Sequence, residues 1–226
     1  MEILRPALLD EIVLEFLNER RALIEHYGEG IVPELSRLTT NVDHLDKEAA
    51  GRRKQILFGM RQPIFDELPK DIEWKLARID RTDYDDLHVI RMPVWEEFTK
   101  YSGKVSTAAR VYLGENPIEH LFKMVGARQM NAPFDTPTGI RPIFRLVEDH
   151  IDKIRNEVIP DIVSSMINYK YIIFTDSTSH KMALIEGNHR AIGVYLSQII
   201  GNSRRLDSHE VFIGTSSQGC HWNDWP

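Results

Sequence analysis

The stretch from Lys170 to Gly201 holds the pattern that most constrains the fold of this chain. Two apolar, β-rich runs, 171–175 and 182–185, are separated by a polar segment that is typical of a turn. After a second polar segment, 186–190, apolar residues recur at helical spacing for the rest of the stretch. The sequence therefore predicts a hairpin, a sharp turn and a helix, in that order.

The turn before the helix consists of Glu186, Gly187, Asn188, His189 and Arg190. A helix N-terminus carries unpaired backbone N–H groups and a partial positive charge, so it attracts anions. Gly187 would let a ligand approach the backbone, Asn188 could cap the helix, and Arg190 offers a planar fork for phosphate oxygens. His189 could donate to the same anion or transfer a proton.

Glu186 would repel a bare phosphate at this place, but it suits a magnesium ligand or a general base. The turn is therefore predicted to hold a nucleotide phosphate chain together with Mg²⁺. Glu186 and His189 are the expected catalytic residues, and Glu186 is the expected metal ligand. The residues expected to bind the phosphates or the nucleotide are Gly187, Asn188, His189 and Arg190. In the structural alternative, Gly187 only makes a turn, Asn188 caps the helix, and Arg190 pairs with Glu186 on the surface.

The N-terminal part of the chain is expected to be mainly helical. Apolar residues recur at three- and four-residue steps from Leu9 to Tyr27, which predicts a helix that Pro6 opens and Gly28 ends. A second helix is expected at about residues 41–58. Its basic cluster Arg52–Lys54 is expected to face solvent.

Strands and helices are both expected in the middle of the chain. The segments predicted there are a strand at 72–76, an acidic polar turn at 80–86, a strand at 87–90, a loop at 131–135 and an amphipathic helix at 143–158. We expect a helical region at 1–90 and an α+β domain at 91–226, with the helical part packed on a small mixed sheet.

A strand is also expected at 210–213, close to the end of the chain. The stretch 214–219 that follows has the glycine spacing at the start of a P-loop but lacks its Lys-Ser/Thr pair, so it is not a Walker motif. Its backbone amides could still form a small anion-binding nest.

Composition excludes several classes of protein. The 226-residue chain has a net charge of −6, which argues against a protein that coats nucleic acid non-specifically. Its single cysteine, Cys220, excludes an intramolecular disulfide framework and a Cys-rich zinc site. No apolar run approaches the ~18 residues of a membrane span, and the first residues lack the pattern of a secretory signal. We therefore expect a cytoplasmic protein without a membrane partner.

The stretch from Tyr171 to Leu196, centred on Ile-Glu-Gly-Asn-His-Arg-Ala, resembles the phosphate-binding signature of the ParB/sulfiredoxin-like superfamily. That signature is an acidic or small residue, Gly, a variable position, often His, and then Arg, at the start of a helix that follows a strand. The superfamily includes chromosome-partition CTPases, sulfiredoxins, free serine kinases that use ADP, and DGQHR-type proteins of DNA-modification systems. The resemblance implies a ParB/sulfiredoxin-like α+β fold for residues 91–226.

Departures from the superfamily pattern reduce the number of superfamily functions that the chain could share. Asn188 stands where sulfiredoxins need Cys, and the Gly-Glu-Arg-Arg signature of partition proteins is absent. The pattern of the turn is most similar to that of the free serine kinases. By that resemblance Gly187, His189 and Arg190 would hold the phosphates, and Glu186 would hold Mg²⁺ or the acceptor.

The resemblance also implies a separate upstream carboxylate as base, for which Glu96, Glu97 and Asp176 are the candidates. The expected function is that of a phosphotransferase or nucleotide hydrolase that uses ATP, ADP or CTP with Mg²⁺ and a small acceptor. One alternative is a nucleic-acid-associated protein of a DNA-modification or restriction system, with DNA as its partner. The other is a non-catalytic ParB-like binding module.

Overall fold

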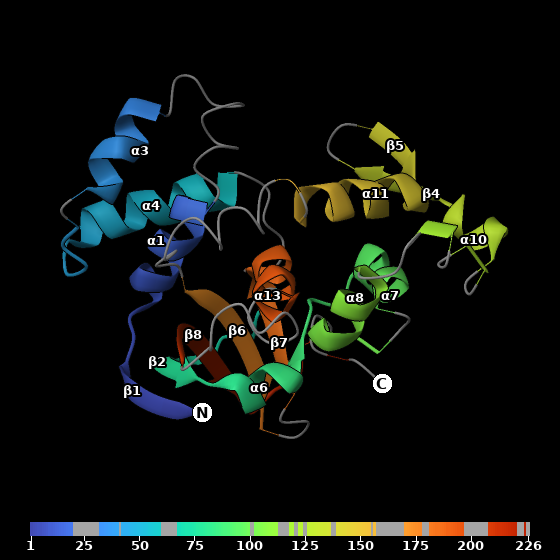
Figure 1. Ribbon diagram of the computed structural model, residues 1–226. Coiled ribbons are helices and arrows are strands. Elements are labelled where there is room, and N and C mark those ends of the chain that lie inside the picture. The colour runs from blue at the N-terminus through green and yellow to red at the C-terminus, as the bar shows by residue number, and fades with distance from the viewer. Residues whose placement is uncertain are drawn as a thin grey trace.

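The computed structural model describes residues 1–19, 32–40, 42–59, 67–99, 102–112, 118–119, 122–123, 126–136, 139–154, 156, 170–177, 181–196, 208–220 and 224. Within them the chain is a mixed α+β structure, as predicted (Figure 1). In this part of the chain, we find no helix that is both long enough and apolar enough to cross a membrane.

A six-stranded sheet forms the base of the molecule, with the strand order β1-β2-β8-β6-β7-β3. Its strands are β1 (Glu2–Pro6), β2 (Glu73–Ile79), β3 (Leu87–His88), β6 (Tyr171–Asp176), β7 (Met182–Glu186) and β8 (His209–Ser216). The pairs β1–β2, β2–β8 and β6–β7 are antiparallel, whereas β6–β8 and β3–β7 are parallel. Strands from both sides of residue 90 thus belong to one sheet, so the domain boundary expected at that residue divides the sheet.

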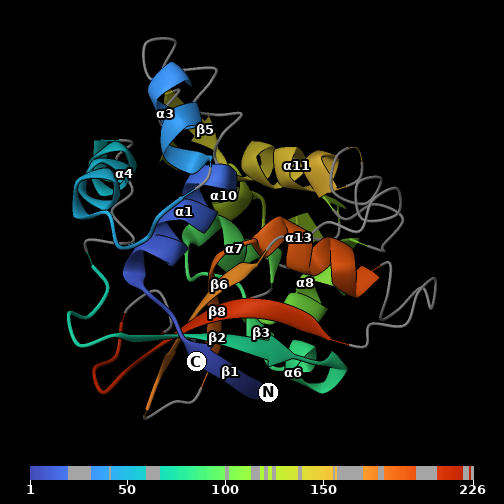
Figure 2. The same ribbon diagram turned by 90° about the vertical axis from the view of Figure 1, so that its left-hand side faces the viewer.

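Helices cover the sheet and connect its strands. They are α1 (Leu9–Glu19), α3 (Val32–Thr39), α4 (Lys47–Gly59), α6 (Arg81–Asp85), α7 (Pro93–Phe98), α8 (Val105–Tyr112), α10 (Ala127–Met130), α11 (Ile143–Lys153) and α13 (Asn188–Val194). Figures 1 and 2 show α1, α7, α8 and α13 on one side of the sheet. Beneath them, Tyr171, Ile172, Ile173 and Phe174 of β6 are completely buried, which explains why this strand is a continuous apolar run.

The first predicted helix is shorter at its start than expected. It begins at Leu9 because residues Glu2–Pro6 form the edge strand β1, which the sequence pattern does not predict. Its expected end at Gly28 lies outside the described residues. The second predicted helix, α4, begins at Lys47, where the Asp46 carboxylate accepts hydrogen bonds from the following backbone N–H groups and caps the helix.

Two predicted irregular segments contain regular structure. The acidic turn holds α6, which begins with a capping box between Asp80 and Asp83. The predicted loop at 131–135 is wrong in part, because Pro133–Thr136 is β4 and pairs antiparallel with β5 (Gly139–Pro142). The amphipathic helix predicted at 143–158 is α11, whose described bounds end at Lys153.

A buried ion pair joins the N-terminal helices. Arg53 of α4 is 1% exposed, so the expectation that this part of the basic cluster faces solvent is wrong. Its Nε donates to Asp10 Oδ1 of α1 at 2.7 Å, its Nη2 donates to the other oxygen, and its Nη1 donates to the carbonyl oxygen of Leu38 at 3.1 Å. His44 Nδ1 also lies 2.7 Å from Asp10 Oδ2. The carboxylate of Asp10 therefore connects α1, α4 and the segment before α4.

Candidate functional site

The predicted strand, turn and helix are present, and the register of the sheet places the turn. Glu186, the last residue of β7, pairs with Ile172 near the start of β6. Gly187 then takes a left-handed conformation, with φ 95° and ψ 14°, and is the N-cap of α13. Its N–H donates to Glu186 Oε1 at 3.0 Å, so the carboxylate of Glu186 folds back over the turn.

Gly187 is required by its backbone conformation and by a close neighbour. A Cβ on this residue would lie 2.5 Å from Cδ1 of Tyr171, which is shorter than side chains tolerate. The Tyr171 ring in turn stacks on His209 at a centroid distance of 4.4 Å, and its hydroxyl accepts a hydrogen bond from Tyr84 at 2.9 Å. A protein ring, rather than open space for a ligand, therefore occupies the Cβ side of Gly187.

Asn188 does not cap the helix that it begins. The N-cap is Gly187, and it makes no side-chain capping bond. The side chain of Asn188 is 8% exposed, and its Oδ1 accepts a hydrogen bond from the backbone N–H of Ile90 at 2.9 Å. Asn188 thus ties the start of α13 to the chain that leaves β3.

His189 packs against α7. Its ring lies 5.1 Å from the ring of Trp95, centroid to centroid, with an angle of 62° between the two planes. Trp95 itself is buried and packs edge-on against Phe98. The aromatic surface of α7 therefore fixes where His189 lies.

Arg190 is half-buried in the first turn of α13. Burial lowers the pKa of its guanidinium to about 10, and the negative charge of Glu15 on α1 acts in the opposite direction. Glu15 is held by a hydrogen bond from the backbone N–H of Lys170 to its Oε1 at 2.9 Å. Glu15 could not be singled out from the sequence, because it is one of four acidic residues on α1 and lies far from the turn along the chain.

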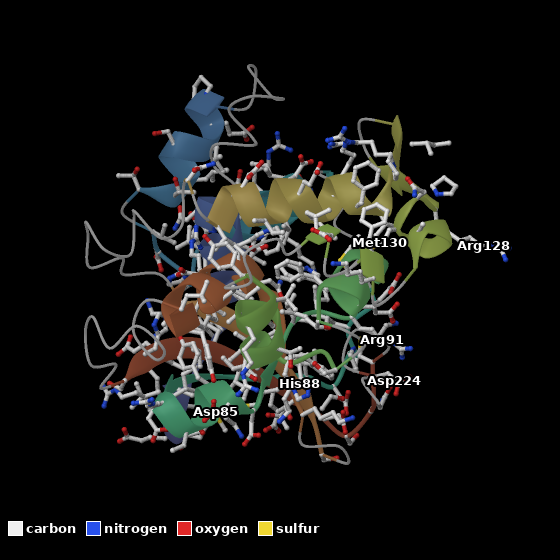
Figure 3. The ribbon with its side chains drawn as sticks, turned by 45° about the vertical axis from the view of Figure 1, so that its right-hand side comes forward. Asp85, His88, Arg91, Arg128, Met130 and Asp224 are labelled. Atoms are coloured by element: carbon white, nitrogen blue, oxygen red, sulfur yellow. The ribbon has the colours of Figure 1, made fainter. Side chains whose placement is uncertain are left out.

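The three candidate upstream carboxylates lie in different surroundings. Glu96 is on α7, next to Trp95, and its Oε1 accepts a hydrogen bond from Nε of Arg91 at 3.0 Å. The same guanidinium pairs with Asp224 Oδ2 at 3.0 Å (Figure 3). Asp176 pairs with Ser216 at the opposite end of β6 from the turn, so it is not part of the site. The side chain of Glu97 lies outside the described residues.

The donors for a metal ion are few. Among the residues that the structure describes, no three His, Cys, Asp or Glu side chains come together as a metal site. Glu186 offers one carboxylate at the turn, and Mg²⁺ commonly takes one or two carboxylates with the remaining ligands from phosphate oxygens and water. Its donor chemistry therefore fits Mg²⁺ bound together with a phosphate chain.

The predicted anion nest at 214–219 receives an anion from the chain itself. The hydroxyl of Ser216 and both the hydroxyl and the N–H of Ser217 donate to the carboxylate of Asp71. The N–H of Gln218 donates to the Ser216 hydroxyl at 2.9 Å. The carboxylate of Asp71 thus accepts hydrogen bonds from both serines.

Comparisons with protein-family models, with curated proteins and with solved structures find no match for this chain.

Proposed function

We propose that the turn at 186–190 binds the phosphate chain of a nucleotide with Mg²⁺, and that the protein is a nucleotide-dependent phosphotransferase or nucleotide hydrolase. The observation that carries this proposal is Arg190, a half-buried guanidinium three residues after a left-handed glycine at a strand-to-helix turn. Burial disfavours its charge and lowers its pKa to about 10. A bound anion would stabilise that charge.

The neighbouring side chains suit phosphoryl transfer, which depends mainly on positioning and on neutralising charge. Arg190 would pair with phosphate oxygens, and His189, steadied by Trp95, would donate to the same group or move a proton. Glu186 would hold Mg²⁺, which supplies positive charge against the phosphates when bound. ATP, ADP and CTP are the candidate nucleotides, and the acceptor would be a small hydroxyl compound or water.

The acidic neighbours favour this function over nucleic-acid binding. Glu186 lies within the turn, and the charge of Glu15 acts on Arg190. Both carboxylates would repel the bare phosphodiester backbone of DNA, whereas a metal-complexed phosphate chain carries less negative charge. A ParB/sulfiredoxin-like fold is part of the same proposal, and the strand–turn–helix arrangement supports it. A cytoplasmic location is also part of the proposal.

Calorimetric titration of the full chain with ATP, ADP and CTP, with and without Mg²⁺, tests the proposal. We expect Mg²⁺-dependent binding of at least one nucleotide. Since hydrogen bonds to charged groups contribute about 1.5–3 kcal/mol, Arg190→Ala should weaken binding by at least about tenfold. Arg145→Ala is the matched control, because Arg145 is exposed and pairs with Glu148 on α11.

A thermal unfolding curve for each variant shows whether it is folded. If the wild type binds no nucleotide, the proposal is overturned. If Arg190→Ala binds as tightly as the wild type, the nucleotide site lies elsewhere. Salt-sensitive binding to duplex DNA without nucleotide binding would instead support a nucleic-acid-associated function.

A further inference from the structure

We propose that two copies of this chain form a two-fold symmetric dimer through the outer edge of β1. The two β1 strands run antiparallel to one another and join the two sheets into one continuous sheet. The inference is independent of the proposed function, since β1 and the turn after β7 belong to opposite halves of the strand order.

Strand β1 leaves one edge of the sheet open. It pairs with β2 on one side, and no other strand of the described residues lies beyond it. Figures 1 and 2 show β1 at the margin of the molecule. Four of its five residues are exposed. The backbone groups at such an edge can pair with a strand of another molecule.

The backbone groups of Ile3 face this open edge. The N–H of Ala7 donates to the carbonyl oxygen of Trp74 at 2.9 Å, so Trp74 directs its backbone groups toward β1. Because these groups alternate in direction along a strand, Ala77, three residues later, directs its own toward β8. Ile3 lies opposite Ala77. The N–H and C=O of Ile3 therefore point away from β2, where a second molecule can reach them.

A bulge in β1 places two opposite charges on one face of the sheet. Glu2 lies opposite Arg78, and Arg5 lies opposite Leu76, two residues away on β2. Residues two apart on a regular strand point to the same face, so Glu2 and Arg5 share a face although they are three residues apart. Ile3 lies between them in the register and points to the other face.

This pattern is complementary to itself. When two β1 strands pair antiparallel about an axis at Ile3, Glu2 of each copy lies opposite Arg5 of the other. Both residues are exposed, and opposite charges in directly opposed positions stabilise a pair of strands. The two Ile3 side chains, each 49% exposed in the single chain, meet at the axis on the other face. Each dimer thus gains two ion pairs and one apolar contact between the strands.

Exposed apolar side chains are concentrated next to β1. Among the described residues, six large apolar side chains are exposed, and four of them belong to the first nine residues: Met1, Ile3, Leu8 and Leu9. In an antiparallel pair the start of one strand lies beside the end of the other, so Met1 of one copy approaches Leu8 of the second. Dimer formation therefore removes apolar surface from water at both ends of the paired strands.

Association through this edge should stop at two copies. Pro6, the last residue of β1, has no N–H and ends the ladder. The strand at the opposite edge of the sheet, β3, has only two residues and offers little for another copy to pair with. Because a two-fold pair uses β1 of both molecules, neither offers this strand to a third.

Sedimentation velocity of the full chain over a range of concentrations tests the inference. We expect a dimer whose proportion rises with concentration, whereas a chain that stays monomeric throughout overturns the inference. Glu2→Arg opposes like charges at two symmetric positions, so the dissociation constant of the dimer should rise by at least about fourfold. Glu73→Arg is the matched control, because exposed Glu73 lies on β2 outside the segment that pairs with β1.

A mixing experiment separates the interface from folding. Glu2→Arg and Arg5→Glu each oppose like charges when alone, but a mixture of the two variants opposes unlike charges at both positions. We expect each variant to be mainly monomeric and the mixture to dimerise. A wild-type dimer that these substitutions leave unchanged, or a mixture that does not associate, overturns the inference. Thermal unfolding of each variant confirms that the monomers are folded.

Discussion

Arg53 and Arg190 are both withdrawn from solvent, to different degrees, and their surroundings differ. Arg53 in the N-terminal helices is 1% exposed, and its guanidinium donates to both oxygens of Asp10 and to the carbonyl oxygen of Leu38. Arg190 at the turn is half-buried, and burial lowers its pKa to about 10 against the opposing charge of Glu15. The first cation is part of a closed internal network, and the second lies in the first turn of α13, directly after a strand-to-helix turn.

This difference shows that the partners of a buried arginine, and not its burial alone, decide what the residue does in the fold. Charged groups placed inside a protein are costly unless good partners surround them. At Arg53 the partners are Asp10 of α1 and the carbonyl oxygen of Leu38 in α3, so the guanidinium joins α1, α3 and α4. Arg190, by contrast, lies in the first turn of the helix in a strand–turn–helix segment, and its charge is the feature that we propose an anion recognises.

The largest expected effect comes from Arg53→Met, which leaves the carboxylate of Asp10 buried without its main partner. We expect the free energy of unfolding, measured by urea titration, to fall by about 3–5 kcal/mol. Arg190→Met should lower it by only about 1 kcal/mol or less, since burial already disfavours that charge. Arg52→Met, next to Arg53 but in an exposed pair with Glu34, should change stability least of the three. A larger loss at Arg190 than at Arg53 would reverse the comparison.

The next effect concerns the turn that carries Arg190. Gly187→Ala combines a left-handed backbone with a Cβ 2.5 Å from the Tyr171 ring, so we expect a loss of about 2–4 kcal/mol in unfolding free energy. Gly126→Ala is the matched control, because Gly126 has nearly the same φ of 93° but open space around its Cβ position. Equal losses in the two variants would mean that the contact with Tyr171 adds nothing beyond backbone strain.

The smallest predicted effect is the pH dependence of stability that Asp10 contributes. Burial alone would raise its pKa, but hydrogen bonds from Arg53 and His44 outweigh burial and lower the pKa below the ordinary value. A carboxyl whose pKa is lowered by folding stabilises the protein above its unfolded pKa. That contribution is lost as the pH falls through the folded pKa, so stability should decline below about pH 4.

Urea unfolding of the wild type and of Asp10→Asn between about pH 2 and pH 7 measures this contribution as the difference between the two pH slopes. We expect a shallower decline in Asp10→Asn. Parallel curves would show that other carboxylates, such as that of Glu11, account for the acid sensitivity.

Local sequence signals predicted the secondary structure correctly where they agreed with one another. The β-rich run of β6, the polar segment after it and the glycine before α13 predicted the strand, turn and helix at 171–196, because each depends on neighbouring residues alone. Strand β4 was missed because Pro133 and Asp135 are poor strand formers, and its pairing with β5 outweighs their preference. The capping box of α6 could have been found, since Asp80 and Asp83 have its spacing.

Local sequence signals could not predict which residues surround the turn. The contacts of Asn188 with Ile90, of His189 with Trp95 and of Gly187 with Tyr171 join residues that only the folded sheet brings together. The sequence also could not tell Arg53 from Arg52, because the two are adjacent and of one type, and only the rotation of α4 about its axis decides which one is buried. The residues of the turn were foreseen, whereas Glu15 was not.

The position of β8 governs the order in which the molecule can assemble. This strand lies between β2 and β6, so the sheet stays in two pieces until residues 209–216 are available. During synthesis on the ribosome, β1 and β2 must therefore wait, with an unpaired edge, for a partner encoded more than half the chain later. Exposed strand edges favour aggregation, so the nascent chain should depend on chaperones until β8 has emerged.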